Sequence, residues 1–267
     1  MYFSAFVSSS VAVPAVLVAF GLATGFLLWA LLALRTHHNA GRRVSFTTVS
    51  LLVTDIAEMI FLAVIAIVYM AVSRDNPTLS YAYGFFVVCM AVIYFRLCAS
   101  CFHQLAALEG LLSLTSSLGT TGLATPRVSI PISVAVWVWG IVSVYLTFQR
   151  DLSVLLLATY LACLLLLVVS SIVTCLKANA QSPPVRKQVL RVFGVATATH
   201  VLLYGPVFTC VCLYAMGLPQ GEVFNIAAAI MNFSLVTDPL LLALVLRRET
   251  QRSPVNERRL DMSVVGA

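Results

Sequence analysis

Seven apolar segments, each long enough to cross a lipid bilayer as a helix, constrain this chain more than any other feature of its sequence. They cover residues 11–34, 46–72, 79–106, 129–148, 152–176, 188–216 and 223–246, with short polar stretches between them. None shows the strict polar–apolar alternation of a membrane strand, whereas a helix satisfies its own backbone hydrogen bonds in lipid. The sequence therefore predicts an all-α membrane protein, a seven-transmembrane helix bundle.

The composition agrees with this fold, and the distribution of basic residues orients it. Charged residues make up only 10% of the chain and hydrophobic residues 61%, whereas soluble domains carry about 25% charged residues. One set of alternate loops, together with the C-terminal tail, carries twelve basic residues, and the other set carries only Arg74 and Arg150. Because basic loops stay in the cytosol, we expect residues 1–10 to be a short extracellular N-terminus, 11–246 the membrane domain and 247–267 a cytosolic tail. The twelve are Arg35, Arg42, Arg43, Arg127, Lys177, Arg186, Lys187, Arg247, Arg248, Arg252, Arg258 and Arg259.

Polar and ionisable side chains recur inside four of these segments. Asp55 and Glu58 are three residues apart in the second segment, and therefore lie on one helical face. The third and sixth segments show similar spacings, and the seventh carries four polar residues. We expect these polar faces to point at one another, with Arg96 paired to Asp55 or Glu58, because an unpaired charge in the membrane is costly. The other members are Ser100, His103, His200, Tyr204, Asn225, Asn232, Ser234 and Asp238.

Two interpretations of these side chains stay open. Ser100, Ser234 and the asparagines are typical of hydrogen bonds that hold membrane helices together. The full charges of Asp55, Arg96 and Asp238 favour a functional role instead. The two histidines lie on different segments without an obvious third ligand, so we do not expect a transition-metal site.

Two prolines fall inside the sixth and seventh segments. Pro206 and Pro239 each remove a backbone donor and permit a kink. They are candidate hinges, and fixed bends explain them equally well.

Three short motifs carry a resemblance that covers nearly the whole chain, residues 11–250. They are "SLLVTD" at 50–55 with its acid Asp55, "LLYGP" at 202–206 with Tyr204 and Pro206, and "TDPLLLAL" at 237–244 with Asp238 and Pro239. These resemble the second-, sixth- and seventh-helix motifs of the rhodopsin-like G-protein-coupled receptors. The "RRE" at 247–249 would begin the short amphipathic helix that follows in that family.

The resemblance implies a water-filled site, often holding sodium, between the positions of Asp55 and Asp238. Two neighbouring carboxylates would bind a cation or share a proton, because like charges at close range do not both stay ionised. Arg96 could supply the counter-charge instead.

The chain departs from the family at two positions that receive the cytosolic partner. "LEGLL" stands where the family has D/E-R-Y, so Glu109 keeps the acid but Gly110 replaces the arginine. Leu242 replaces the tyrosine of the seventh-helix motif. Both departures argue against ordinary G-protein coupling. The chain's only lysines are Lys177 and Lys187, outside the seventh segment, so it cannot hold retinal as a Schiff base and we expect no cofactor.

The leading functional hypothesis is a plasma-membrane receptor that senses an extracellular ligand and signals through cytosolic partners, for which the resemblance implies a G protein or arrestin. Arg96 would contact an anionic group of the ligand, and a salt bridge from Arg96 to Glu58 is the competing interpretation. Activation would tilt the sixth helix about Pro206. The predicted ligand-binding residues are Tyr83, Val87, Tyr94, Arg96, Tyr204, Phe208 and Asn225.

Two other functions stay open. A proton- or ion-conducting or transporter-like protein would use a relay of titratable groups in the membrane, namely Asp55, Glu58, Arg96, His103, His200 and Asp238. A signalling-dead scaffold with the receptor fold would explain "LEGLL" at residues 108–112. We do not expect an enzyme, since no catalytic motif is present. Nucleic acid is not an expected partner either, because the basic residues are spread over loops where they can meet lipid phosphates.

Overall fold

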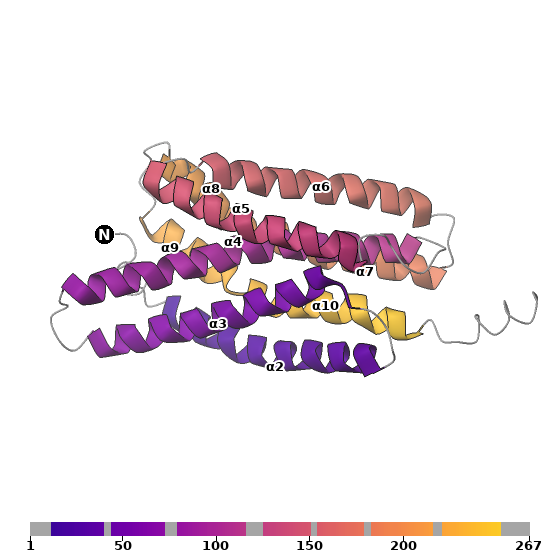
Figure 1. Cartoon of the computed structure of the whole chain (residues 1–267), viewed down its shortest axis with the longest axis horizontal. Helices are drawn as coiled ribbons and strands as arrows, with labels where there is room; N and C mark the ends of the chain where they lie inside the picture. Colours follow the sequence, from indigo (N-terminus) through magenta and orange to yellow (C-terminus); the bar gives the residue numbers. More distant parts are fainter. Residues whose placement is uncertain are drawn as a thin grey trace, which may run out of the picture.

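The computed structural model describes residues 12–39, 44–72, 79–115, 125–150, 154–178, 183–215 and 221–251, and nearly all of them are helical (Figure 1). No β-strand occurs among these residues. The all-helical fold predicted from the sequence is therefore confirmed. The helices are α2 (Ala12–Asn39), α3 (Phe46–Val72), α4 (Leu79–Thr115), α5 (Pro126–Arg150), α6 (Val154–Ala178), α7 (Pro183–Ala198), the π-helix η2 (Thr199–Tyr204), α8 (Gly205–Ala215), α9 (Gly221–Met231) and α10 (Ser234–Gln251).

Each predicted apolar segment corresponds to one helix or to consecutive helices. The first five segments match α2 to α6, the sixth matches α7, η2 and α8, and the seventh matches α9 and α10. Within the described ranges, six stretches are long and apolar enough to cross a membrane, and α6 adds the shorter apolar stretch Leu157–Val173. Helices of this length and composition indicate a multi-pass membrane protein. The six are Leu17–Asn39, Phe46–Val64, Met90–Leu112, Pro126–Thr147, Arg186–Cys210 and Ala229–Leu246.

Local sequence explains where two of the helices begin. Ser45 precedes α3, and its hydroxyl oxygen accepts a hydrogen bond from the backbone N–H of Thr48 at 3.2 Å, which is the N-cap arrangement. Pro126 is the first residue of α5, where its missing N–H costs no helical hydrogen bond.

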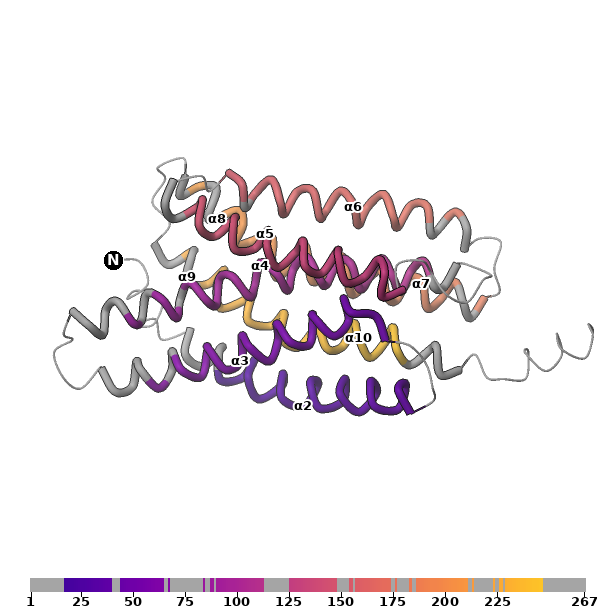
Figure 2. The backbone as a smooth tube through the Cα atoms, viewed as in Figure 1, coloured from indigo at the N-terminus to yellow at the C-terminus, as the bar shows by residue number. Residues whose placement is uncertain are grey.

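Helix α4 lies in the middle of the bundle. It contacts α3, α5, α6, α7 and α10, while α2 packs against α10 and α9 at the periphery. Figures 1 and 2 show α6 and α2 near opposite edges, with α4 between them. Any group on the inner faces of α4 can therefore reach several other helices.

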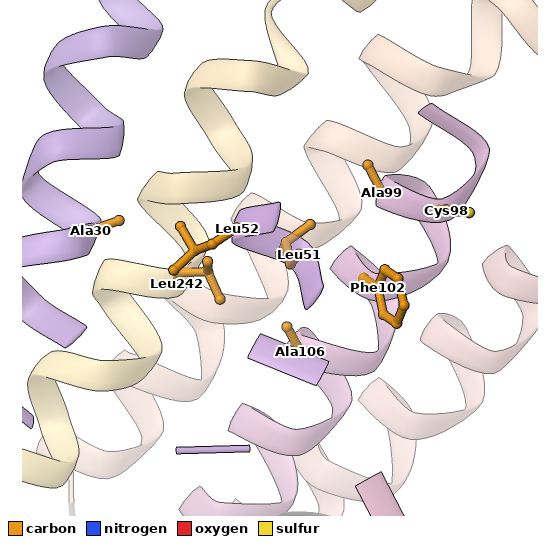
Figure 3. Close-up of a cluster of buried hydrophobic side chains, with 8 residues drawn as sticks. All are labelled: Ala30, Leu51, Leu52, Cys98, Ala99, Phe102, Ala106 and Leu242. Atoms are coloured by element: carbon orange, nitrogen blue, oxygen red, sulfur yellow. The ribbon is translucent and has the colours of Figure 1, made fainter. Parts of the chain in front are cut away.

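The largest apolar contact around α4 joins four helices. Figure 3 shows Leu242 of α10 beside Leu52 of α3, with Ala30 of α2 on one side and the residues of α4 on the other. The small side chains of α2 and α4 allow the larger ones to fill the space between the helices. The buried cluster consists of Ala30, Leu51, Leu52, Cys98, Ala99, Phe102, Ala106 and Leu242.

Two glycines allow α4 to pack closely against neighbouring helices, one of them in α4 and the other in α5. A Cβ at Gly110 of α4 would lie 2.7 Å from Cγ2 of Val245 on α10. A Cβ at Gly140 of α5 would lie 2.5 Å from Sγ of Cys98 on α4. These are contacts that only a residue without a side chain permits. Gly110, which marks the departure from the family's arginine, therefore has a packing role in this fold.

Candidate functional site

Polar side chains from four spans meet in the interior of the bundle. We call this group the polar centre, and all its members are buried. They come from α3, α4, η2, the junction of α9 and α10, and α10 itself. The structure therefore brings together the acids and the arginine that the sequence predicts to face one another. The polar centre consists of Asp55, Glu58, Arg96, His103, Tyr204, Asn232, Ser234 and Asp238.

Arg96 links three of these elements. Its Nε donates to Oε1 of Glu58 at 2.5 Å, and its Nη2 also contacts that oxygen. The same Nη2 donates to the side-chain oxygen of Asn232, between α9 and α10. Of the two acids predicted as partners, the structure selects Glu58. A guanidinium buried in this way depends on its partners, because breaking a buried pair leaves an uncompensated charge.

Asp238 forms a second set of contacts. Its Oδ2 accepts a hydrogen bond from the hydroxyl of Tyr204 at 2.9 Å. Its Oδ1 lies 2.6 Å from Nδ1 of His103 on α4. Asp238 therefore joins α10 to the π-helix of the sixth span and to α4, so the residue at the family's seventh-helix acid is a structural junction here.

Asp55 differs from the other two acids. It is 1% exposed, and neither of its carboxylate oxygens has a hydrogen-bond partner within the described residues. Oε2 of Glu58 and the hydroxyl of Ser234 are also buried without such a bond. Buried polar groups are normally satisfied by a partner, by water or by an ion. These oxygens are the kind that hard cations prefer. The sodium site expected near Asp55 and Asp238 stays a prediction.

Acids outnumber basic groups in the polar centre. It contains three carboxylic acids and one guanidinium, so one buried positive charge faces three acids. An added proton or a bound cation would bring the group nearer to neutrality. The described ranges contain no cluster of three or more His, Cys, Asp or Glu residues arranged to hold a metal ion.

The sixth span widens into a π-helix beside the polar centre. Pro206 has no N–H, and the N–H of Gly205 reaches back to the carbonyl of His200. That carbonyl lies 3.4 Å from the hydroxyl of Tyr160 on α6, whose ring stacks on His200 with centroids 4.6 Å apart. Such π-turns frequently occur at functional sites. The predicted irregularity at Pro206 is thus present as a π-helix that α6 supports.

The last apolar segment, residues 223–246, is interrupted at Asn232 and Phe233. The N–H groups of these residues bond to the carbonyls of Ala229 and Ile230, three positions back, and α10 begins at Ser234. Pro239 lies inside α10, which continues past it. The break therefore lies upstream of the proline at which the sequence suggests a kink, at the residue that contacts Arg96. The predicted hinge roles of both prolines stay predictions.

The residues predicted to bind ligand occupy different surroundings. Tyr204 and Phe208 belong to a buried apolar cluster, and Tyr94 donates from its hydroxyl to the carbonyl of Trp137 at 3.3 Å. Val87 is 48% exposed, on the outside of α4. Arg96 is occupied by Glu58 and Asn232. The side chains of Tyr83 and Asn225 lie outside the described residues.

The remaining predicted residues lie in the C-terminal half of α4. Glu109 accepts a hydrogen bond from the hydroxyl of Thr47 on α3 at 2.8 Å, and Gly110 packs against Val245. Ser100 donates to the carbonyl of Leu97 within its own helix at 2.8 Å. This use of Ser100 is local and connects no other helix.

Sequence reasoning missed three of the observed pairings. These are the contact of Asn232 with Arg96, the contact of His103 with Asp238, and the hydrogen bond between Tyr204 and Asp238. Each residue is recognisable in the sequence as a polar group at membrane depth, but its partner depends on the rotation of two helices. No spacing along the chain reports that rotation.

Comparison with known proteins adds no assignment. No protein-family model matches the chain, and a search of curated proteins finds no significant match. The functional argument therefore rests on the geometry of the polar centre and on the helix arrangement.

Proposed function

We propose that this chain is a seven-span membrane receptor of the rhodopsin-like plan, with its N-terminus outside and its C-terminus in the cytosol. The observation that carries the proposal is the polar centre, in which α3, α4 and both interrupted spans are joined by buried charged contacts around a central α4. Inter-helix contacts without function rarely need full charges in lipid. An arrangement that couples four spans through charges is suited to transmitting a change from one face of the membrane to the other.

The seventh crossing in this proposal is α6. It has 25 residues, which is long enough to span a bilayer when helical, and Leu157–Val173 within it is apolar. Its place beside α4 and α8 completes the ring of helices around α4. Seven crossings then agree with the opposite sides that the basic loops assign to the two termini.

The proposed mechanism uses the two interrupted spans. Ligand binding among the outer halves of α4, α8 and α9 would shift α8 or α9 relative to the polar centre. The contacts of Asp238 with Tyr204 and His103 would then rearrange and tilt the sixth span about η2 and Pro206, a gating motion of known type. A sodium ion or a proton at Asp55 would stabilise one of the two arrangements, since it supplies the charge that the buried carboxylates lack.

The cytosolic partner is set by the end of α4. Gly110 leaves no arginine to receive a G protein, and its packing against Val245 brings α4 and α10 together there. We therefore expect arrestin recruitment to be the more sensitive readout, with nucleotide exchange weak.

The test is ligand-dependent arrestin recruitment and nucleotide exchange in transfected cells, screened with a broad ligand panel. The proposal predicts a response that Tyr204→Phe alters, because that change removes a contact of the sixth span with Asp238. Surface expression of each variant is the control. No response to any ligand, together with unchanged basal activity in Tyr204→Phe and Arg96→Ala, would contradict it.

A second candidate is a proton- or cation-conducting protein. It is favoured by the carboxylate of Asp55, whose oxygens have no hydrogen-bond partner among the described residues. Flux in liposomes that Asp55→Asn abolishes would place this function first. A third candidate, a receptor-fold scaffold, is favoured by Gly110. Stable complexes with another receptor, without nucleotide exchange on any G protein, would support it.

A further inference from the structure

The last span is divided into two helices, and a charged side chain from another helix contacts the division. Helix α9 ends at Met231, α10 begins at Ser234, and Asn232 lies between them. The side-chain oxygen of Asn232 accepts a hydrogen bond from Arg96, which is held at the same time by Glu58 of α3. We call these three residues the Arg96 clamp.

The backbone at the division is not regular α-helix. Asn232, Phe233, Leu235 and Val236 donate to carbonyls three positions back, and the four-position pattern resumes with Thr237, which donates to Phe233. Pro239, which has no N–H, cannot donate to the carbonyl four positions back in the next turn. Interruptions of this kind are where helices bend. The division is therefore the place where the angle between α9 and α10 can change.

The side chains of the clamp, by contrast, are held firmly. Arg96 is 7% exposed and Glu58 and Asn232 are each 1% exposed, so water cannot easily replace the contacts between them. A charge-assisted hydrogen bond is about twice as strong as a neutral one. Helix α9 otherwise contacts α2, α8 and η2, and its described side chains are mostly apolar, as on Ala227, Ala229 and Met231. Such contacts permit sliding and tilting more readily than a directed hydrogen bond does.

We infer that α9 pivots about Asn232 and Phe233 independently of α10, and that the Arg96 clamp holds it in the closed position seen here. Arg96 is thus a positioning residue for the outer half of the last span, and Glu58 orients Arg96 toward Asn232. This inference concerns the conformation of the bundle and goes beyond the proposed function. Only its use in signalling would rest on that function.

The chain provides a control for a polar change on the same helix. Thr54 is four residues before Glu58 on α3 and is equally buried, and its hydroxyl donates to the carbonyl of Leu51 within that helix. Thr54→Val removes this local hydrogen bond, whereas Glu58→Gln changes the acid that holds Arg96. Only Glu58→Gln should therefore release α9.

The experiment measures distances by electron spin resonance in lipid nanodiscs, with a nitroxide pair at Val223 of α9 and Tyr145 of α5, both exposed. Val223 precedes Asn232 by nine residues, which is about 14 Å along a helix. A tilt of about 20° at the break would therefore move the label by about 5 Å. We expect Glu58→Gln and Asn232→Leu to shift or broaden the distance distribution by about that amount, and Thr54→Val to leave it unchanged.

A second label pair shows whether the bundle stays folded. Ile60 of α3 and Tyr145 are both exposed and neither lies on α9, so their distance should be the same in every variant. Should Glu58→Gln prevent folding, Arg96→Lys keeps the charge but loses the planar fork, and it should still shift Val223. Unchanged Val223 distances in Asn232→Leu and in the folded arginine or glutamate variant would overturn the inference, as would an equal shift in Thr54→Val. These distance measurements need no ligand or signalling. They therefore test the pivot of α9 even if the chain is not a receptor.

Discussion

The packing of Gly110 against Val245 yields a sharp prediction about stability. A Cβ at Gly110 would lie 2.7 Å from Cγ2 and 3.3 Å from Cγ1 of Val245, whereas carbon atoms in contact prefer about 3.5–4.0 Å. Valine in a helix has one strongly preferred rotamer, so it cannot easily turn aside. Gly110→Ala should therefore push α4 and α10 apart, at a cost of about 1–3 kcal/mol for overpacking.

Alanine also has a higher helix propensity than glycine, and this gain in stability must be separated from the cost of the clash. The gain is about 1 kcal/mol, so the net loss for Gly110→Ala should be about 0–2 kcal/mol. Gly84 is in the same helix, and a Cβ there meets nothing within 4 Å. Gly84→Ala should therefore show the gain alone. The difference between the two variants, about 1–3 kcal/mol, isolates the clash.

The assay is thermal unfolding of the detergent-solubilised protein, completed by a double-mutant cycle. Val245→Ala removes both crowding carbons and leaves the Cβ of residue 245, which is 3.6 Å from the new methyl group, in ordinary contact. The double variant Gly110→Ala/Val245→Ala should therefore be more stable than the sum of its single changes predicts. If Gly110→Ala unfolds at the temperature of Gly84→Ala, or if the cycle shows no coupling, the close approach of α4 and α10 is wrong.

Two further predictions concern the contacts of α4 and η2. Tyr204→Phe leaves Oδ2 of Asp238 without its 2.9 Å hydrogen bond, so thermal unfolding should show a loss of about 1–3 kcal/mol. The control Tyr94→Phe, which removes a longer bond from a half-buried hydroxyl, should lose less, and equal losses would contradict the special role of Asp238. The Sγ atoms of Cys101 and Cys163 lie 4.0 Å apart on α4 and α6, so the dithiol oxidant diamide should link them into a disulfide that mass spectrometry detects. Cys101→Ser should abolish that linked peptide. If diamide treatment of the protein without this substitution gives no linked peptide, the packing of α4 on α6 is contradicted.

The limits of the helices could be predicted well because lipid imposes a length and a composition on them. Residues 46–72, for instance, are predicted as one apolar segment and form α3 with those bounds. Helix α4 runs past the predicted end at residue 106 to Thr115. The apolar stretch of this helix itself extends to Leu112, so the predicted end falls short of both the apolar stretch and the helix. Hydropathy therefore shows that a helix is present more reliably than it locates the helix ends.

The helix break at Asn232 and Phe233 could not be predicted from the sequence. Pro239 is the recognisable disrupting residue of the last span, yet α10 continues through it, and the interruption lies at Asn232 and Phe233. Proline removes one donor within the helix, which a bend can accommodate. The break also reflects the contact of Asn232 with Arg96, a residue 136 positions away in the sequence.

The residue types alone determined that acids, one arginine and an asparagine would be buried together, because lipid excludes them from the outside of the bundle. They did not determine which of Asp55 and Glu58 would meet Arg96, since both lie on one face of α3. Tertiary packing made that choice: the rotation of α3 against α4 brings Glu58 to the guanidinium and leaves Asp55 without a hydrogen-bond partner among the described residues. A change of one residue along a helix turns a side chain by about 100°, so pairing across helices depends on an angle that only the assembled bundle sets.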